Sequence, residues 1–120
     1  AAIALTTDTS ILTAVANDYA FEQIFARQVR ALGREGDVLV AISTSGNSPN
    51  VVAAVEVAPQ RGLLVGALPR PGRRPLSALL GEQDVNLCVP HERTARIQEV
   101  HLLILHCLCD GIDASLLGDE

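Results

Sequence analysis

An apolar run that leads directly into a turn of hydroxyl-bearing residues constrains the fold of this chain more than any other stretch. Residues Asp37 to Ile42 are almost continuously apolar and rich in β-branched side chains. Such a run is typical of a strand buried on both faces of a parallel sheet. Ser48 then takes an N-cap position, and Pro49 follows where its missing N–H costs nothing. The sequence therefore predicts a strand, a polar turn and a helix in direct succession.

The turn carries four hydroxyl side chains, from Ser43, Thr44, Ser45 and Ser48. Main-chain N–H groups and the helix dipole favour an anion at a helix N-terminus, and a phosphate monoester is a suitable ligand. The same residue types also form ordinary capped turns, and the pattern is neither a P-loop nor a GxGxxG loop. From the residues alone, both interpretations remain open.

The other elements alternate in a pattern that predicts one α/β domain, residues 1–120, with a doubly wound parallel sheet. We expect strands at 1–5, 37–42, 63–68 and 85–89. We expect helices at 10–16, 19–32, 48–61, 76–80 and 93–117, with Gly33 ending the second and Pro59 loosening the third near Ala58. Three arginines in the segment Arg70 to Arg74 could bind an anion, but a solvated surface loop is the favoured interpretation.

The composition excludes several functional classes. Apolar residues make up 48% of the chain with only three aromatic side chains, which predicts a core of Ala, Val, Leu and Ile. A net charge of -5 argues against nucleic-acid binding, and the absence of lysine excludes Schiff-base chemistry. Cys88, Cys107 and Cys109 predict no disulfide framework, which favours a reducing cytoplasm. We find neither a membrane span of roughly 18 uninterrupted apolar residues nor a signal peptide, so we expect no membrane partner.

Two pairs of polar residues outside the turn are candidates for ligand binding or catalysis. Asn17 and Asp18 follow the first predicted strand, near the edge of an α/β sheet where ligands bind, although on the residues alone a helix cap is favoured. On the last predicted helix, Gln98 and His106 lie about 12 Å apart along the axis and roughly 80° around it. Spacing alone favours a core role for a histidine on this apolar helix. The charges of the nearby Glu99 and Asp110 are best explained by solvation.

Three motifs in one order resemble the sugar isomerase (SIS) domain family, and within it the phosphoheptose isomerases: Ala16 to Asp18, Ile42 to Ser48, and Ala95 to His101. The resemblance covers essentially the whole chain. It implies a flavodoxin-like strand order, 2-1-3-4-5, that here lacks the N-terminal helices and the first strand of the family. That strand would lie between strands 1–5 and 37–42, so we expect a fragment of a longer protein or a marginal fold.

The resemblance also implies an activity, which is the interconversion of D-sedoheptulose 7-phosphate and D-glycero-D-manno-heptose 7-phosphate through an enediol. In bacteria this reaction serves heptose and lipopolysaccharide biosynthesis. The implied roles are substrate binding by Asn17, Asp18, Ser43, Thr44, Ser45, Ser48 and Gln98, zinc binding by Gln98 and His106, and proton transfer by His106. The remaining zinc ligands are expected upstream of Ala1, so the chain alone should be almost inactive. The resemblance further implies a homotetramer, and some relatives carry Asp at the position of Ala95.

Two alternatives come from other functional classes. One is a non-catalytic SIS protein that binds the replication initiator. Ser45 and His106 favour the isomerase, because the initiator-binding relative replaces both. The other is a phosphosugar-sensing domain of a regulator, although the sequence contains no recognisable DNA-binding segment.

Overall fold

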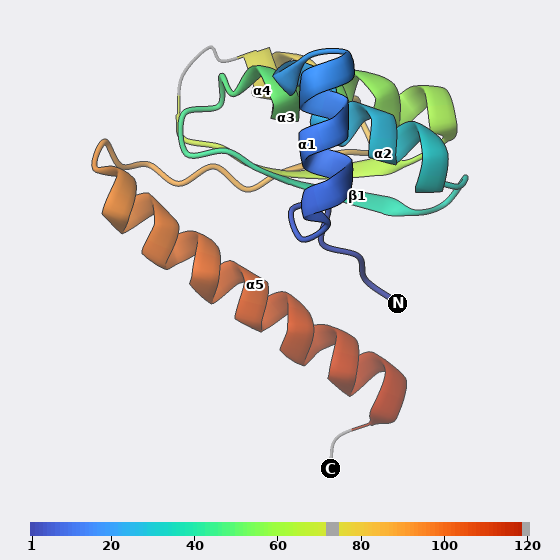
Figure 1. Ribbon diagram of the computed structural model, residues 1–120. Helices are drawn as coiled ribbons and strands as arrows, with labels where there is room; N and C mark the ends of the chain where they lie inside the picture. Colours follow the sequence, from blue (N-terminus) through green and yellow to red (C-terminus); the bar gives the residue numbers. More distant parts are fainter. Residues whose placement is uncertain (72–74, 119–120) are drawn as a thin grey trace.

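The computed structural model describes residues 1–71 and 75–118, which form a parallel sheet with helices on both sides (Figure 1). Its strands are β1 (Val38–Ile42), β2 (Leu64–Leu68) and β3 (Val85–Asn86), in the order β1-β2-β3. Its helices are α1 (Thr9–Asp18), η1 (Phe21–Gln23), α2 (Ile24–Leu32), α3 (Pro49–Val57), η2 (Ala58–Arg61), α4 (Pro75–Ala78) and α5 (Thr94–Leu117).

The predicted α/β class and the parallel direction of the strands are confirmed. Val40 of β1 pairs with Gly66 of β2, and Gly66 pairs in turn with Val85 of β3. The order of the three strands agrees with the last three positions of the expected flavodoxin-like order. Helices α2, α3 and α4 lie on one side of the sheet and α5 lies on the other, while α1 packs against η1 and α2 (Figure 1).

The core lies between the sheet and helices α2 and α3, and small aliphatic side chains build it as the composition predicted. Its buried members are Ala26, Val29, Ala41, Ala54, Val55, Val57, Ala58, Leu63, Val65, Ala67 and Leu76. Small side chains bring helix and strand backbones close together, so a sequence with few aromatic residues still packs densely.

Strand β1 is not buried on both faces, which corrects the prediction from its apolar run. Ala41 is 4% exposed, whereas Val38, Val40 and Ile42 are 60%, 44% and 41% exposed. Successive side chains of a strand point to opposite faces, and α2 and α3 cover only the face of Ala41. The opposite face of β1 therefore presents β-branched side chains to solvent.

The strand expected at residues 1–5 is absent. Within the described residues β1 is hydrogen-bonded only to β2, and residues 1–5 pair with no strand. The segment is instead attached to α2, where Gln28 Nε2 donates to the carbonyl oxygens of Leu5 (2.9 Å) and Ile24 (3.0 Å). An apolar segment becomes a strand only when a neighbouring strand pairs with its backbone.

Helix boundaries differ from the predictions where capping decides them. Helix α1 is capped by Asp8, whose Oδ1 accepts from the Ile11 N–H at 2.9 Å, rather than by Ser10. The helix expected at 19–32 divides into η1 and α2, and Gly33 ends it as predicted. The predicted loosening near Ala58 is confirmed, because α3 ends at Val57 and η2 follows.

At the edge of the sheet opposite β1, strand β3 is short, and the carboxylate of Asp84, just before it, bonds an amide of β2 in its place. Asp84 Oδ1 accepts from the Val65 N–H of β2 at 2.7 Å, and its Oδ2 accepts from the Gly81 N–H at 2.8 Å. The strand expected at 85–89 ends at Asn86, although Leu87 N–H still donates to the Ala67 oxygen at 2.8 Å. Of the predicted arginine loop, residues 72–74 lie outside the described residues.

Helix α5 stands apart from the rest of the described chain. Only Ile97 and His101 are buried among its 24 residues, and Leu103 and Leu116 are 61% and 78% exposed. Its length and mean hydropathy of 1.6 meet the criterion for a helix that could cross a membrane, where the sequence was expected to hold no such segment. Core helices of soluble proteins meet the same criterion.

Candidate functional site

The turn after β1 is held together by its own hydroxyl groups. Ser43 is 5% exposed, and its Oγ lies 2.9 Å from Ser48 Oγ and 3.4 Å from Ser45 Oγ. Ser43 Oγ also accepts from the Gly46 N–H at 3.1 Å, and Ser45 Oγ accepts from the Asn47 N–H at 3.1 Å. The sequence therefore builds a compact turn in which hydroxyl groups fix the backbone.

The turn delivers the chain to the N-terminus of α3, as predicted. Ser48 occupies the N-cap position and Pro49 the first helical position, but the Ser48 side chain makes no cap hydrogen bond. Its hydroxyl group bonds Ser43 instead. The positive end of the α3 dipole thus lies beside a group of neutral hydroxyls, which suits a phosphate.

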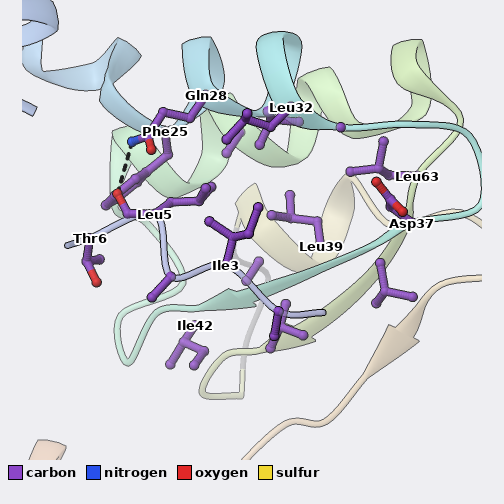
Figure 2. A pocket seen from close by; sticks show the side chains of 18 of the residues that line it. Ile3, Leu5, Thr6, Phe25, Gln28, Leu32, Asp37, Leu39, Ile42 and Leu63 are labelled. Carbon is purple, nitrogen blue, oxygen red and sulfur yellow. Dashed lines mark hydrogen bonds between the residues drawn. The ribbon is translucent and has the colours of Figure 1, made fainter. Parts of the chain in front are cut away.

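The turn lies at one end of a large cavity without lining it. This cavity of about 780 Å³ runs between residues 1–6, α2 and β1, and Ile42 and Val51, on either side of the turn, are among its lining residues (Figure 2). Ser43, Thr44, Ser45 and Ser48 are not among them. Thr44 and Ser48 are half-buried and Ser45 is exposed, so a ligand of the turn would sit at the molecular surface.

Asn17 and Asp18 lie in the last turn of α1, not in a loop that follows a strand. Both side chains are exposed, and Asn17 Nδ2 donates to Asp18 Oδ1 at 2.8 Å. The pair does not form the side-chain cap of the following helical segment, because the N-cap residue of η1 is Ala20 and that of α2 is Gln23. The amide and the carboxylate are available to hydrogen-bond hydroxyl groups of a ligand.

Gln98 and His106 are both exposed on α5. His106 lies nine residues after the buried Ile97, a rotation of about 180°, so His106 faces away from the side of α5 that packs on the domain. Among the described residues no group of three or more His, Cys, Asp and Glu side chains could hold a metal ion. The described residues therefore complete no metal site of His, Cys, Asp and Glu side chains around His106.

His101 is the buried histidine of α5, and it is also the last residue of the Ala95 to His101 motif. It is 3% exposed, and neither ring nitrogen has a hydrogen-bond partner within the described residues. Burial lowers the pKa of the imidazole from its ordinary value of 6.5. Its position four residues after the buried Ile97 was the sequence signal for a core residue.

Comparisons with known proteins place these features in a family. The sequence profile of the SIS domain matches residues 1–69. Phosphoheptose isomerases from Azoarcus sp. (strain BH72) and Aromatoleum aromaticum are 64% and 66% identical over 120 residues. The structure of phosphoheptose isomerase GmhA from Neisseria gonorrhoeae superposes with a TM-score of 0.92 at 59% identity, over 95% of this chain. A phosphoheptose isomerase from Francisella tularensis gives 0.90 at 50% identity.

These matches cover only part of each relative. The chain spans 61% of the length of the Azoarcus and Aromatoleum proteins, and 62% of the gonococcal chain. The resemblance stated from the three motifs is confirmed at the level of the family and of its fold.

Proposed function

The chain belongs to the SIS domain family, and from this premise we propose that it forms the phosphate-binding part of a phosphoheptose isomerase. The hydroxyl cluster of Ser43, Ser45 and Ser48 beside the N-terminus of α3 is the observation that carries the proposal. The high identity to proteins named phosphoheptose isomerase supports it. The substrate is then a phosphorylated seven-carbon sugar, D-sedoheptulose 7-phosphate or D-glycero-D-manno-heptose 7-phosphate.

In this proposal the turn grips the phosphate, remote from the carbons that react. Ser45 is exposed and Thr44 and Ser48 are half-buried, so their hydroxyls can donate to phosphate oxygens while Ser43 keeps the turn in shape. Such a grip supplies binding energy that positions the reacting end of the sugar. Asn17, Asp18 and Gln98 would bind the sugar and hold it in one orientation.

The reaction moves a proton between neighbouring carbons through an enediol. His106 would take part in this proton transfer, together with a carboxylate expected upstream of Ala1. The amide oxygen of Gln98 and the imidazole of His106 are donors that zinc accepts, and a bound zinc ion would polarise the substrate oxygens. A zinc site takes about four ligands, so two donors on α5 do not complete one, and the remaining ligands would come from outside the described residues.

The assembly and the place of the reaction belong to the same proposal. Helix α5 exposes Leu102, Leu103, Leu116 and other apolar side chains, which suits burial against further copies in a homotetramer. The reaction would take place in the cytoplasm and supply heptose for lipopolysaccharide.

The alternative of a protein that binds the replication initiator gains no support from the relatives described above, which are named as isomerases.

Sugar phosphate binding tests the proposal directly. Titration of the chain with sedoheptulose 7-phosphate should shift the amide resonances of residues 43–51 and give a measurable heat of binding. Ser45→Ala should weaken binding by about tenfold or more, because a hydrogen bond to a charged phosphate is lost. Ser115→Ala is the matched control, because this exposed serine bonds Gly111 O on α5 and should leave binding unchanged. Unshifted resonances at 43–51 would contradict the proposal.

Activity gives a second measurement. The chain alone should isomerise sedoheptulose 7-phosphate very slowly, since Gln98 and His106 would supply only two of the zinc ligands and no group of three or more His, Cys, Asp and Glu side chains among the described residues could hold the metal. Turnover close to that of the Neisseria gonorrhoeae enzyme, assayed side by side, would show that the described residues suffice and that the assignment of the missing ligands is wrong.

A further inference from the structure

Helix α1 carries Asn17 and Asp18 in its last turn, yet none of its residues is buried. We infer that Arg27 is a positioning residue of the sugar site. Its guanidinium group stacks on the ring of Tyr19, directly after Asp18, and this contact holds the amide and the carboxylate where the sugar binds. The inference rests on the proposed function, because it concerns the sugar end of the same ligand.

The attachment of α1 to the domain is sparse. Its main neighbours are η1 and α2, and it presents no buried side chain to either of them. A helix without a buried face gains little from the hydrophobic effect, so contacts at its two ends decide where it lies. Before its first turn, Gln28 Nε2 of α2 donates to Leu5 O at 2.9 Å. The last turn, with Asn17 and Asp18, requires a contact of its own.

The ring of Tyr19 supplies this second contact. The chain leaves α1 at Tyr19, whose N–H donates to Val15 O at 3.0 Å. The Cζ atom of Arg27 lies 3.8 Å from the centre of the Tyr19 ring, close enough for a cation–π interaction. Within residues 1–71 and 75–118 Arg27 makes no ion pair. Because Tyr19 is 61% exposed, the stacked guanidinium holds the ring, and burial in the core does not.

The stacked pair joins the sugar-binding residues to the helices that carry the phosphate turn. Helix α2, which bears Arg27, packs against α3, and η1 contacts both of these helices. Helix α3 begins at Pro49, immediately after Ser48 of the turn. A ligand that reaches both groups binds tightly only when both are already fixed, because ordering a loose group on binding costs free energy.

The arrangement predicts a difference between two ligands. Inorganic phosphate reaches only the turn, whereas sedoheptulose 7-phosphate also reaches Asn17 and Asp18. Loss of the Arg27 contact should therefore weaken binding of the sugar phosphate and leave binding of inorganic phosphate unchanged. A general loss of folded protein would weaken binding of both ligands equally.

Titration calorimetry of the 120-residue chain with these two ligands provides the test. Arg27→Gln should weaken binding of sedoheptulose 7-phosphate by about threefold, the fold-change of a surface cation–π contact. Arg30→Gln is the matched control, because this exposed arginine of α2 loses the same charge, but its Nη1 donates to Gln23 Oε1 at 3.2 Å and does not stack on a ring. It should leave both affinities unchanged. Equal weakening by the two substitutions would show an effect of charge alone and overturn the inference.

Variants of the ring separate the stacking from the rest of the tyrosine side chain. Tyr19→Phe keeps the ring and should bind the sugar phosphate as tightly as the unmodified chain. Tyr19→Leu removes the ring and should cause the same loss as Arg27→Gln. The double variant should lose no more than either single variant, because both remove one contact. Losses that add up would show two independent effects and contradict the inference.

NMR of the chain without ligand gives a measurement that does not depend on binding. Side-chain protons of Arg27 that lie over the ring should be shifted upfield, in the unmodified chain and in Tyr19→Phe but not in Tyr19→Leu. The amide resonances of Asn17 and Asp18 should move in Arg27→Gln, and those of α3 should not, which also shows that the variant folds. Unshifted Arg27 protons in the unmodified chain would overturn the stacking itself.

Failure of the inference and failure of the proposed function give different results. If the unmodified chain and Arg27→Gln bind both ligands equally well, only the inference fails. If the unmodified chain binds inorganic phosphate as tightly as the sugar phosphate, Asn17 and Asp18 add no affinity, and the inference fails while the phosphate grip stands. If neither ligand shifts the resonances of residues 43–51, the proposed function fails and the inference fails with it.

Discussion

The hydroxyl of Ser43 links both ends of the turn after β1, because it accepts from the Gly46 N–H and bonds Ser48 Oγ. Ser43→Ala removes both bonds in a buried site and should lower the free energy of unfolding by about 1 kcal/mol. Urea unfolding measures the change. Ser115→Ala, at an exposed position on α5, should change stability by much less. Equal effects of the two substitutions would show that the hydroxyl network does not stabilise the turn.

Two glycines with positive φ offer a second comparison of single residues. Gly62 has φ 71° and Gly36 has φ 86°, and the Gly36 N–H donates to Gly62 O at 3.0 Å. Alanine at either position is strained by about 1 kcal/mol. A Cβ at Gly62 would also lie 3.2 Å from Glu35 Cα, whereas the space around Gly36 is open. Thermal unfolding should therefore rank Gly62→Ala as less stable than Gly36→Ala, and the opposite rank would contradict this account.

At the scale of elements, His101 makes the attachment of α5 sensitive to acid. Burial lowers its pKa below 6.5 in the folded state, so below this pH the unfolded chain binds more protons than the folded one. Stability should therefore fall as the pH drops from about 7.5 to about 5. His101→Leu should reduce this dependence, as measured by urea unfolding at several pH values, whereas His106→Gln, at an exposed position, should keep it. Parallel curves for all three proteins would contradict the role of His101.

The sequence could predict the elements whose signals are local. The β1 run, the Pro49 start of α3 and the break before Pro59 depend on neighbouring residues, and all three are present. The strand expected at residues 1–5 failed because pairing needs a partner strand that no local signal reveals. The burial of Val40 was wrong for the same reason, since it depends on which helices cover each face of the sheet.

In the candidate site, too, the features with local signals could be predicted from the sequence, and those that depend on distant parts of the chain could not. The Ser43 to Ser48 turn is local, and the structure builds it where the sequence places it. Whether Gln98 and His106 approach that turn depends on the position of α5, which has only two buried residues and is therefore weakly fixed by the described chain. The assignment of His106 to proton transfer and zinc stays a prediction.

At the scale of the whole molecule, the exposed apolar face of α5 couples stability to concentration. Leu103 and Leu116 are 61% and 78% exposed, and their burial between copies would favour the folded state by mass action. The midpoint of thermal unfolding should rise with protein concentration in calorimetry under reducing conditions. Leu103→Glu should remove this dependence, whereas Leu32→Thr, an exposed leucine on α2 across the sheet from α5, should retain it. A midpoint independent of concentration would contradict association through α5.

The carboxylate of Asp84 has a consequence for aggregation. It takes up the Val65 amide of β2 that a longer β3 would bond, so the β3 side of the sheet presents only a two-residue strand. An open-ended fibril of stacked sheets grows only when every subunit has two long edges, one to receive its neighbour and one to serve the next. The sheet formed by residues 1–71 and 75–118 has one such edge, and edge-to-edge polymerisation of this chain should stop after a single addition.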